Sequence, residues 1–445
     1  MARTGVLVAA CALLLGFAAA VGSAAGQDFV RVSGNKLGMS GFSDGRAYIT
    51  DLFRQAQQKN FNVFRFFVQG DYSYLTTAPG EYDESVFQGF DYVLAEAAKF
   101  NIRLTPVLLN LWNDDGVPLF EKFCGSDSTN VKPAPAIDLR EGSTLNETER
   151  IQTPYVWYTS ADCRGYVKDF ITKVVTRKNS ITGVAYRDDP AIFSWNLLNE
   201  PRCKYCGPEA VTEWYHDIAA HIKSVDPNHL VTTGEEGFFD ESSKYAAADP
   251  TDGNLWGPRS GQDFVANHDS PDIDYAVIHL WPNNWAALDI DFGKTWVSSH
   301  VRAAQELGKP LVVEEFGKAV SDENQIASVR NPWYSLVYDA AARSIASGGP
   351  LRGAMFWLWD GTDTTVQTNP IIVSSGDDTM RSIILPFAQQ QVGVCGSLGG
   401  NATAAPAAEA PAAEETAPQE TAPEEATPSI VTLVAAAGRK LLAKH

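Results

Sequence analysis

The sequence predicts a single (β/α)₈ barrel, in which eight parallel strands are surrounded by helices. Three observations lead to this prediction. Short apolar runs alternate with amphipathic helical patterns along residues 27–395, several runs are almost continuously apolar, and no linker-like stretch interrupts the region. Continuous apolarity is typical of strands that are covered on both faces. Repeated strand–helix units imply parallel pairing, and eight of them fit one closed barrel domain.

Seven strands are expected where the chain is most apolar, and an eighth is weaker. The clear strands are 61–68, 102–109, 192–198, 229–233, 273–280, 311–313 and 353–359, and the weak first strand is 36–41. Apolar stripes predict helices over 86–97 and 211–225. Asn331 and Pro332 have the pattern of an N-cap followed by proline, which predicts a helix to about residue 347. Trp195, inside a strand, and Trp214, on a helical stripe, are expected in the core.

Both ends of the chain differ in composition from the barrel region. Residues 1–26 contain a basic residue, an apolar run and then small residues, which is the pattern of a signal peptide. Residues 396–428 form an Ala/Pro/Glu/Thr-rich linker that cannot bury a core, and residues 429–445 form a C-terminal peptide expected to be disordered. The apolar part of that peptide is far shorter than the roughly 20 residues that span a bilayer. We therefore expect a secreted protein, extracellular or in the cell wall, without a membrane span.

The charge balance narrows the class of partner. The chain has 35 Lys and Arg against 54 Asp and Glu, a net charge of −19. Such a chain is a poor candidate for binding nucleic acid or anionic membranes. A neutral polymer is the easier partner.

Five cysteines remain after the predicted signal peptide, and in an oxidising compartment they predict one or two disulfides and a leftover thiol. Spacing does not determine their pairing. The two that form a Cys-x-x-Cys motif are expected to make a structural disulfide, because half of a zinc site is weak by itself. Asn146 and Asn401 are N-glycosylation acceptors in a secreted chain. The five cysteines are Cys124, Cys163, Cys203, Cys206 and Cys395.

Two predicted strands are followed by acidic residues at the end of the barrel where chemistry takes place. Glu200 comes directly after the strand that ends near 198, and Glu314 and Glu315 follow the strand at 311–313. Hydrolysis of a glycosidic bond needs a pair of carboxyl groups, one to protonate the leaving oxygen and one to attack carbon or activate water. A single glutamate more often caps a helix or forms an ion pair, but two at matching strand ends favour catalysis.

Aromatic residues gather at the same strand ends. Sugar rings present flat C–H faces that stack on aromatic rings, while their hydroxyl groups seek polar partners. The polar candidates are Arg65, Asn199 and His279, and the aromatic ones are Trp112, Trp281, Trp285, Trp357 and Trp359. The sequence therefore indicates a carbohydrate site.

Several motifs closely resemble plant-type endo-β-1,4-mannanases of glycoside hydrolase family 5. They are the run ITGVAYRDDPAIFSWNLLNEPRC at 181–203, EGFF from Glu236, HLWP from His279, EFGK from Glu315, and Phe356-Trp357. The similarity covers roughly residues 28–395. It implies hydrolysis of β-mannan with retention of configuration by a monomer that uses no cofactor or metal. Carboxyl groups as close as retention requires raise the pKa of one of the pair.

The resemblance also implies roles for individual residues. Glu200 would be the acid/base and Glu315, directly before Phe-Gly, the nucleophile. Asn199 would contact the 2-hydroxyl of the sugar, Arg65 and His279 would order the carboxylates, and Trp357 would form the floor of the cleaved subsite. The substrate-binding set that we expect is Arg65, Phe67, Asn110, Trp112, Asn199, Glu236, His279, Trp281 and Trp357.

The chain departs from the family pattern at a few positions. Phe67 stands where relatives usually have Trp, Trp281 replaces a Tyr, and the region of the first strand is short. Side chains alternate along a strand, so Glu314 is expected to point away from Glu315 and to be a structural partner. The alternatives to a mannanase are another β-1,4-glycanase such as a cellulase, a mannan transglycosylase, and a catalytically dead carbohydrate-binding barrel.

Overall fold

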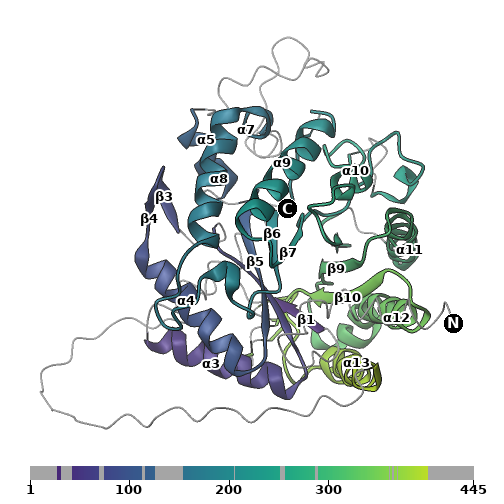
Figure 1. Ribbon diagram of the computed structural model, residues 1–445. Coiled ribbons are helices and arrows are strands. Elements are labelled where there is room, and N and C mark those ends of the chain that lie inside the picture. The colour runs from purple at the N-terminus through teal and green to yellow at the C-terminus, as the bar shows by residue number, and fades with distance from the viewer. Residues whose placement is uncertain are drawn as a thin grey trace, which may run out of the picture.

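Eight parallel strands form a barrel in the computed structural model of the chain (Figure 1). Their hydrogen-bonded order is β7-β6-β5-β2-β1-β10-β9-β8. Strands β7 and β8 are the two ends of this order. A hydrogen bond closes the barrel between them, where the Asp274 N–H, just before β8, donates to the Val231 carbonyl over 2.9 Å. The predicted fold class is therefore confirmed. The structure describes residues 28–31, 43–69, 75–112, 116–125, 154–204, 206–250, 256–285, 289–359, 361–362, 365–367 and 369–398.

The barrel strands agree with the seven clear runs of the sequence to within a few residues at each end. At the second glutamate the strand continues three residues further than predicted, through the two acidic residues to Phe316. The strands are β1 (Asp28–Arg31), β2 (Val63–Phe67), β5 (Arg103–Asn110), β6 (Ser194–Asn199), β7 (Leu230–Thr232), β8 (Ala276–Leu280), β9 (Leu311–Phe316) and β10 (Leu351–Phe356). A small antiparallel hairpin of β3 (Thr76–Ala78) and β4 (Glu81–Tyr82) lies between β2 and the next helix.

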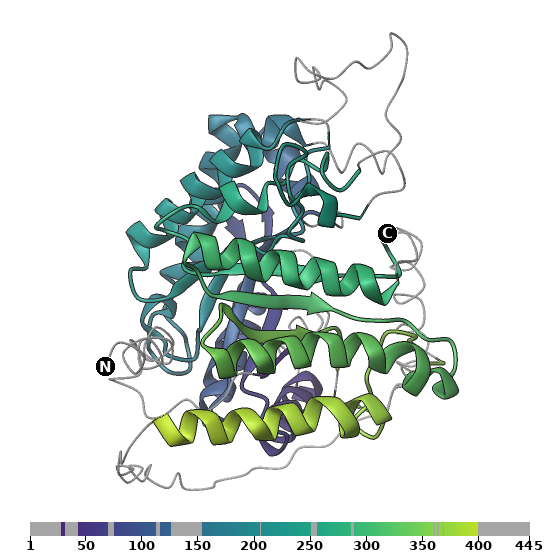
Figure 2. The same ribbon diagram turned by 90° about the vertical axis from the view of Figure 1, so that its right-hand side faces the viewer.

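Helices cover the outside of the barrel (Figure 1). In Figure 2 the green helices α11 and α12 run side by side, with the yellow-green α13 next to them. The helices are α3 (Ser43–Gln58), α4 (Glu84–Lys99), α5 (Val117–Phe123), α7 (Tyr155–Thr159), α8 (Ala161–Val175), α9 (Glu209–Val225), α10 (Phe264–His268), α11 (Ile290–Leu307), α12 (Asn331–Ser347) and α13 (Leu385–Leu398), with short 3₁₀ or π turns at 186–188, 246–248, 323–325, 326–330 and 380–384. No helix in these described residues is long and apolar enough to cross a membrane.

The first barrel strand lies earlier than the sequence predicted. The structure places β1 at Asp28–Arg31, paired with β10 on one side and β2 on the other. The segment predicted as this strand, 36–41, lies outside the described residues. The physical reason for the error is that 28–31 contains an aromatic and a β-branched residue, whereas the region chosen from sequence contains two glycines, which weaken strands.

The prediction that Asn331 caps a helix was wrong, although the helix itself was placed correctly. Asn331 is the first residue of α12, and a π turn at Ile326–Arg330 leads directly into it. Because the preceding backbone is already helical, no capping position exists there. The Asn331 side chain instead donates to Asp378 over 2.7 Å and accepts from Thr379 over 2.7 Å.

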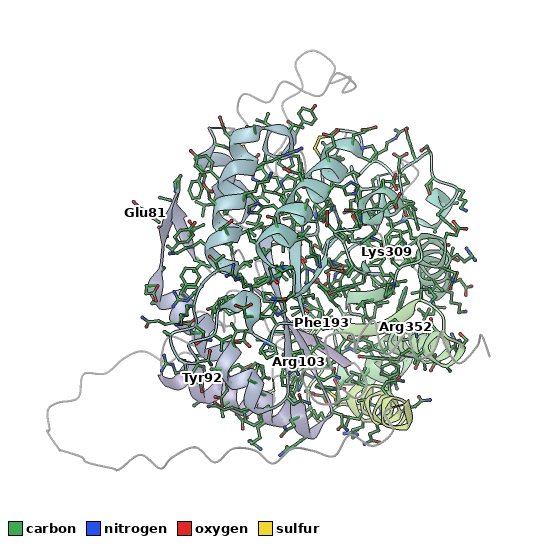
Figure 3. The ribbon with its side chains drawn as sticks, viewed as in Figure 1. Glu81, Tyr92, Arg103, Phe193, Lys309 and Arg352 are labelled. Carbon is green, nitrogen blue, oxygen red and sulfur yellow. A yellow bond between two sulfur atoms is a disulfide. The ribbon has the colours of Figure 1, made fainter. Side chains whose placement is uncertain are left out.

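The core has two parts. A large cluster fills the space between strands and helices, and Trp195 and Trp214 are fully buried in it, as predicted. A smaller apolar cluster fills the barrel interior and consists of Val63, Tyr275, Val277, Val312 and Met355, with Phe193 and Leu230 packed against it. Most of its members lie where strands begin. Figure 3 labels Arg103, Phe193, Lys309 and Arg352, which also lie at or just before the first residues of strands or one residue into them. The opposite end of the barrel is left for polar groups.

Two disulfides join four of the five cysteines, so the prediction of one or two is confirmed. Cys124 pairs with Cys163, and Cys203 pairs with Cys206 as the motif suggested. Both predicted glycosylation sites, Asn146 and Asn401, lie outside the described residues. So do the predicted signal peptide and the chain beyond 398.

Candidate active site

The candidate site lies at the carboxyl-terminal ends of the barrel strands. Five strands carry its polar groups: β2, β5, β6, β8 and β9. The polar residues are Arg65 on β2, Asn110 on β5, Asn199 and the following Glu200 at the end of β6, His279 on β8, and Glu314 and Glu315 on β9. Contacts between their side chains connect all seven. The sequence prediction that these strand ends converge is therefore correct in geometry.

Glu200 sits at a sharp turn of the backbone. Its φ of 51° is in the left-handed region, which is uncommon for a residue other than glycine, and its N–H donates to the Gly234 carbonyl over 2.9 Å. The two carboxylate oxygens accept from the Trp112 indole over 2.6 Å and from His279 Nδ1 over 2.8 Å. Glu200 is thus held on both oxygens at the end of β6.

Glu315 is held in the same way by two other donors. Arg65 Nη1 donates to its Oε2 over 2.9 Å, and the indole Nε1 of Trp281 donates to its Oε1 over 3.1 Å. Glu315 is only 5% exposed. Each oxygen of this buried carboxylate therefore has a hydrogen-bond donor.

The two carboxyl groups lie close together. A side-chain oxygen of Glu200, an oxygen of Glu315 and a ring nitrogen of His279 all lie within 4.8 Å of one another. In glycosidases the carboxyl groups are about 5–5.5 Å apart when one is a nucleophile, and about 6.5–9.5 Å apart when a water molecule must fit between them. The spacing belongs to the shorter class.

A chain of amides aligns Arg65 with the end of β5. Arg65 Nη2 donates to Asn199 Oδ1 over 2.8 Å, and Asn199 Nδ2 donates to Asn110 Oδ1 over 3.0 Å. The same oxygen of Asn110 accepts the backbone N–H of Trp112 over 3.3 Å. Asn110 therefore connects the residues around both carboxylates.

The expectation that Glu314 points away from Glu315 was wrong. Strands β8 and β9 pair Ile278 with Val313 but His279 with Glu315, so Glu314 is an extra residue in a β-bulge. The bulge interrupts the alternation of side chains. Glu314 consequently faces the barrel interior, where its Oε1 accepts from Asn196 over 2.7 Å. It is a structural partner, as expected, but on the same side as the site.

Charged neighbours determine the protonation state of His279. Burial alone would lower the pKa of His279, but Glu315, Glu200 and Glu314 outweigh burial and raise that pKa to about 9. Burial would likewise raise the pKa of Glu314, but Arg65, His279 and Asn196 hold it below its usual value. At neutral pH the site therefore contains an imidazolium with N–H groups on both ring nitrogens.

Glu236 contributes through an arginine that the sequence interpretation left without a role. Arg202 Nε donates to Glu236 Oε2 over 2.9 Å, and the Arg202 guanidinium lies 5.2 Å from the centre of the Trp112 ring. Burial raises the pKa of Glu236 even though Arg202 opposes the shift. Gln262 donates to the same carboxylate over 2.9 Å. The position of Arg202, two residues after Glu200, is a signal that could have identified it.

The predicted aromatic residues divide into a group at the site and a group in the core. Trp112 and Trp357 are half-buried, and Trp281 packs edge-on against Trp357 with ring centres 6.0 Å apart. Phe67 is only 1% exposed, and its ring lies 5.5 Å from the Arg65 guanidinium, so it packs against Arg65. Trp285 and Trp359 are buried in the large core cluster and lie outside the site.

The group of Glu200, His279 and Glu315 has the residue types of a metal site, the one such group among the described residues. The positive charges already present beside this group disfavour the binding of a metal cation. Metal binding requires a neutral imidazole, whereas His279 is protonated at neutral pH, and the Arg65 guanidinium adds a second positive charge. We therefore treat the group as an acid–base site.

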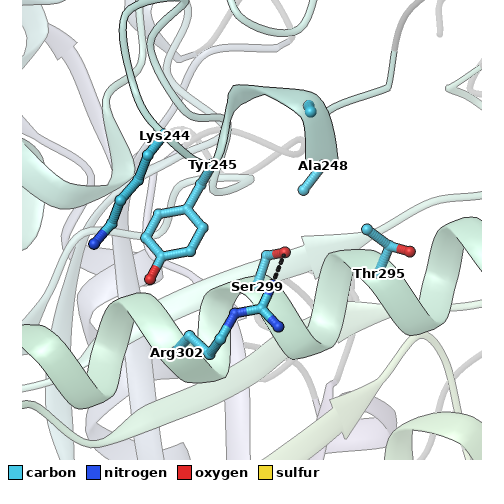
Figure 4. A pocket seen from close by; sticks show the side chains of 7 residues that line it. Lys244, Tyr245, Ala248, Thr295, Ser299 and Arg302 are labelled. Atoms are coloured by element: carbon cyan, nitrogen blue, oxygen red, sulfur yellow. Dashed lines mark hydrogen bonds between the residues drawn. The ribbon is translucent and has the colours of Figure 1, made fainter.

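A shallow surface pocket of about 340 Å³ lies elsewhere, beside helix α11 (Figure 4). Its lining is Lys244, Tyr245, Ala247, Ala248, Thr295, Ser299 and Arg302. Lys244 forms an ion pair with Glu306, and Arg302 donates to Ser299 over 3.0 Å. The pocket is on the outer helical layer, so we place the chemistry at the strand ends instead.

A barrel with two carboxyl groups this close at its carboxyl-terminal face, beside half-buried tryptophans, is a glycoside hydrolase. Comparisons with known proteins identify the family. The GH family 5 beta-mannosidase-like family model matches residues 71–381. The chain therefore belongs to glycoside hydrolase family 5, and the resemblance of its motifs is confirmed.

The relatives extend over most of the chain. It is 34% identical over 349 residues to mannan endo-1,4-beta-mannosidase 1 of Arabidopsis thaliana, covering 74% of this chain and 78% of that protein. It is 33% identical over 390 residues to mannan endo-1,4-beta-mannosidase 1 of rice (Oryza sativa subsp. japonica), covering 80% and 84%. The endo-1,4-beta-mannanase structure from Rhizomucor miehei matches with a TM-score of 0.63 at 23% identity, covering 84% and 96%, and supports the fold.

Proposed function

We propose that the chain is a secreted endo-β-1,4-mannanase that cleaves internal bonds of mannan, glucomannan or galactomannan with retention of configuration. The short distance between Glu200 and Glu315 carries the proposal, because retaining glycosidases have carboxyl groups about 5–5.5 Å apart and inverting ones have them farther apart. The choice of mannan is supported by relatives that are named mannan endo-1,4-beta-mannosidases.

In the first step the Glu315 carboxylate attacks the anomeric carbon, and the bond from that carbon to the glycosidic oxygen breaks. Glu200 donates its proton to the departing oxygen. Arg65 and Trp281 donate to Glu315 and hold it in place for attack. The product is a sugar ester of Glu315, and both bond changes occur between groups that the structure already brings together.

In the second step Glu200, now ionised, accepts a proton from water. The resulting hydroxide oxygen attacks the anomeric carbon and releases Glu315 as a carboxylate. His279 and Trp112 hold both oxygens of Glu200, so the same carboxyl group can give and then accept a proton without moving. Two inversions at carbon leave the configuration unchanged.

The half-buried Trp357 and Trp112 are the aromatic residues that we expect to contact sugar. Trp357 follows β10 directly and packs against Trp281, which holds Glu315. Trp112 donates to Glu200. Each aromatic surface is therefore tied to one of the two reacting carboxyl groups.

Secretion is proposed from the signal-peptide pattern of residues 1–26 and is supported by the two disulfides, which persist in oxidising compartments.

The test of the reaction is to incubate purified protein with mannan, glucomannan and carboxymethylcellulose, and to compare the wild type with Glu315→Ala and Glu200→Ala. We expect mannan cleavage in the wild type and at least a thousandfold loss in Glu315→Ala. Proton NMR of the first products should show the β-anomer. An initial α-anomer, or equal cleavage by Glu315→Ala, would refute the mechanism.

Other outcomes of the same experiment identify the alternatives. Cleavage of carboxymethylcellulose alone would indicate a cellulase, and longer oligosaccharides formed at high mannan-oligosaccharide concentration would indicate a transglycosylase, because a sugar can replace water in the second step. Binding to mannan without cleavage would indicate a dead barrel.

A further inference from the structure

Glu314 is a buried acid that the family motifs leave without a role. The bulge between β8 and β9 turns it inward, and it is 1% exposed. Its Oε1 accepts from Asn196, which fixes the side chain from one side. The carboxylate is therefore buried and fixed in the barrel interior, next to Glu315 in the sequence.

Two cations point at the other oxygen of Glu314. Arg65 Nε lies 3.5 Å from Glu314 Oε2, and His279 Nε2 lies 3.7 Å from the same atom. Among the described residues, these three buried atoms have no conventional hydrogen-bond partner. Buried polar atoms are normally paired, so their convergence on one point indicates an ionic arrangement in which one carboxylate oxygen serves both cations.

The same two cations hold the catalytic pair. Arg65 donates to Glu315 and His279 donates to Glu200. We propose that Glu314 is a positioning residue, the shared counter-ion that keeps His279 doubly protonated and Arg65 directed at the nucleophile. This inference rests on the proposed function, since it assigns Glu200 and Glu315 their roles in that reaction.

The charge balance of the cycle gives the reason for a third carboxylate. Before reaction, with Glu200 protonated, Glu314 and Glu315 balance Arg65 and His279. After the first step Glu315 is a neutral ester and Glu200 is ionised, so Glu314 and Glu200 balance the same two cations. The site is electrically neutral in both states only if Glu314 is charged, and a buried net charge is costly.

Several ionisable groups face His279 and must be counted in any pH effect. They are Glu200 after β6, Glu235 and Glu236 after β7, Arg65 on β2, and Glu314 and Glu315 on β9. Glu235 is fully buried, and burial raises its pKa well above the usual value, a shift toward the neutral form. Glu235 thus offers a matched control, because it is a buried glutamate near the site whose surroundings disfavour a charge.

The experiment compares Glu314→Gln with Glu235→Gln in the full chain. Removing a negative charge from Glu314 makes it easier for the Glu200–His279 pair to lose a proton. We expect the basic limb of the plot of kcat against pH to shift to lower pH by about one pH unit or more, since opposite charges this close shift pKa values by about 1–3 units. On that limb kcat falls about tenfold for each pH unit, while KM stays nearly constant. Glu235→Gln should leave the limb in place.

A direct titration keeps the inference testable if a variant folds poorly or mannan is not the substrate. The ring-nitrogen NMR signals of ¹⁵N-histidine-labelled wild type, assigned with His279→Gln, should show His279 doubly protonated at pH 7. A neutral His279 in the wild type, or an unshifted basic limb in folded Glu314→Gln, would overturn the role of Glu314. Absence of mannan cleavage with a charged His279 would instead refute only the proposed substrate.

Discussion

The indole Nε1 of Trp281 donates to Oε1 of Glu315 over 3.1 Å, on the opposite side of the carboxylate from Arg65. The motif resemblance places a tyrosine at this position in relatives. The structure therefore shows that an indole at this position reaches Glu315 and donates to it. An indole N–H can only donate a hydrogen bond, whereas a phenol hydroxyl can both donate and accept one.

We predict that Trp281→Phe lowers kcat by about 10–100-fold, because a hydrogen bond to a charged group contributes about 1.5–3 kcal/mol. Trp281→Tyr should retain activity with a changed rate and pH profile, because it restores a donor in a different position. The measurement is kcat on mannan from pH 4 to 9. Identical rates and pH profiles in the wild type and Trp281→Tyr would contradict a role for the indole.

We predict that chelators leave activity unchanged. The three side chains with metal-ligand character are Glu200, His279 and Glu315, and the protonated ring of His279 has no free lone pair to bind a metal. Activity after dialysis against EDTA should equal that of an untreated sample. If dialysis lowers activity and added Ca²⁺, Mg²⁺ or Zn²⁺ restores it, a metal is required.

The sequence was a good guide to the strand ends of the site because their chemistry is local. An apolar run followed by Asn-Glu-Pro or Glu-Glu-Phe-Gly marks where a buried strand stops and polar groups begin. Glu200 and Glu315 could therefore be named before the structure was known, and the distance between them agrees with the expected pair.

Other features depend on how separate strands align, which no local pattern records. The inward turn of Glu314 comes from a bulge, and a bulge is a mismatch in residue count between two strands. The position of β1 was missed for a local reason instead, because the segment chosen from the sequence contains two glycines. The place of Arg202 after Glu200 was visible in the sequence, but its contacts with Glu236 and Trp112, which follow other strands, were not.

We predict that Arg202→Met lowers the free energy of unfolding by about 3–5 kcal/mol, because it leaves the buried Glu236 carboxylate without its guanidinium partner. The double variant Arg202→Met/Glu236→Gln should recover part of this loss, since no buried charge remains. Urea denaturation at pH 7 measures both. Equal stability of the single and double variants would show that the pair contributes little beyond packing.

We predict that the two disulfides contribute unequally to stability. Cys124 and Cys163 are separated by 39 residues, and the loop-entropy relation gives about 4 kcal/mol for such a closure, against about 2 kcal/mol for Cys203 and Cys206, separated by 3. Urea denaturation of the two double Cys→Ser variants should show the larger loss for the long loop. The reverse order would indicate that the short disulfide stabilises the native loop after Glu200.

We predict that Asp91 makes stability fall at low pH. Burial would raise the pKa of this carboxylate, but hydrogen bonds from Arg177, Ser180 and Tyr186 outweigh burial and lower it. Because the folded pKa is below the unfolded value of about 4, the stabilisation is complete above that value and is lost as the pH falls toward the folded pKa.

The Asp91→Asn variant should therefore lose about 2 kcal/mol at pH 7, where the wild type keeps these charge-assisted bonds. As the pH falls from about 4 to below the folded pKa of Asp91, the two proteins should converge, because the wild-type carboxyl group also becomes neutral. Asp217→Asn, which removes a partly exposed ion pair with Lys168, is the control and should change stability little at any pH. A constant difference between Asp91→Asn and the wild type from pH 7 to pH 2 would show that Asp91 acts through packing, because only a charge interaction disappears on protonation.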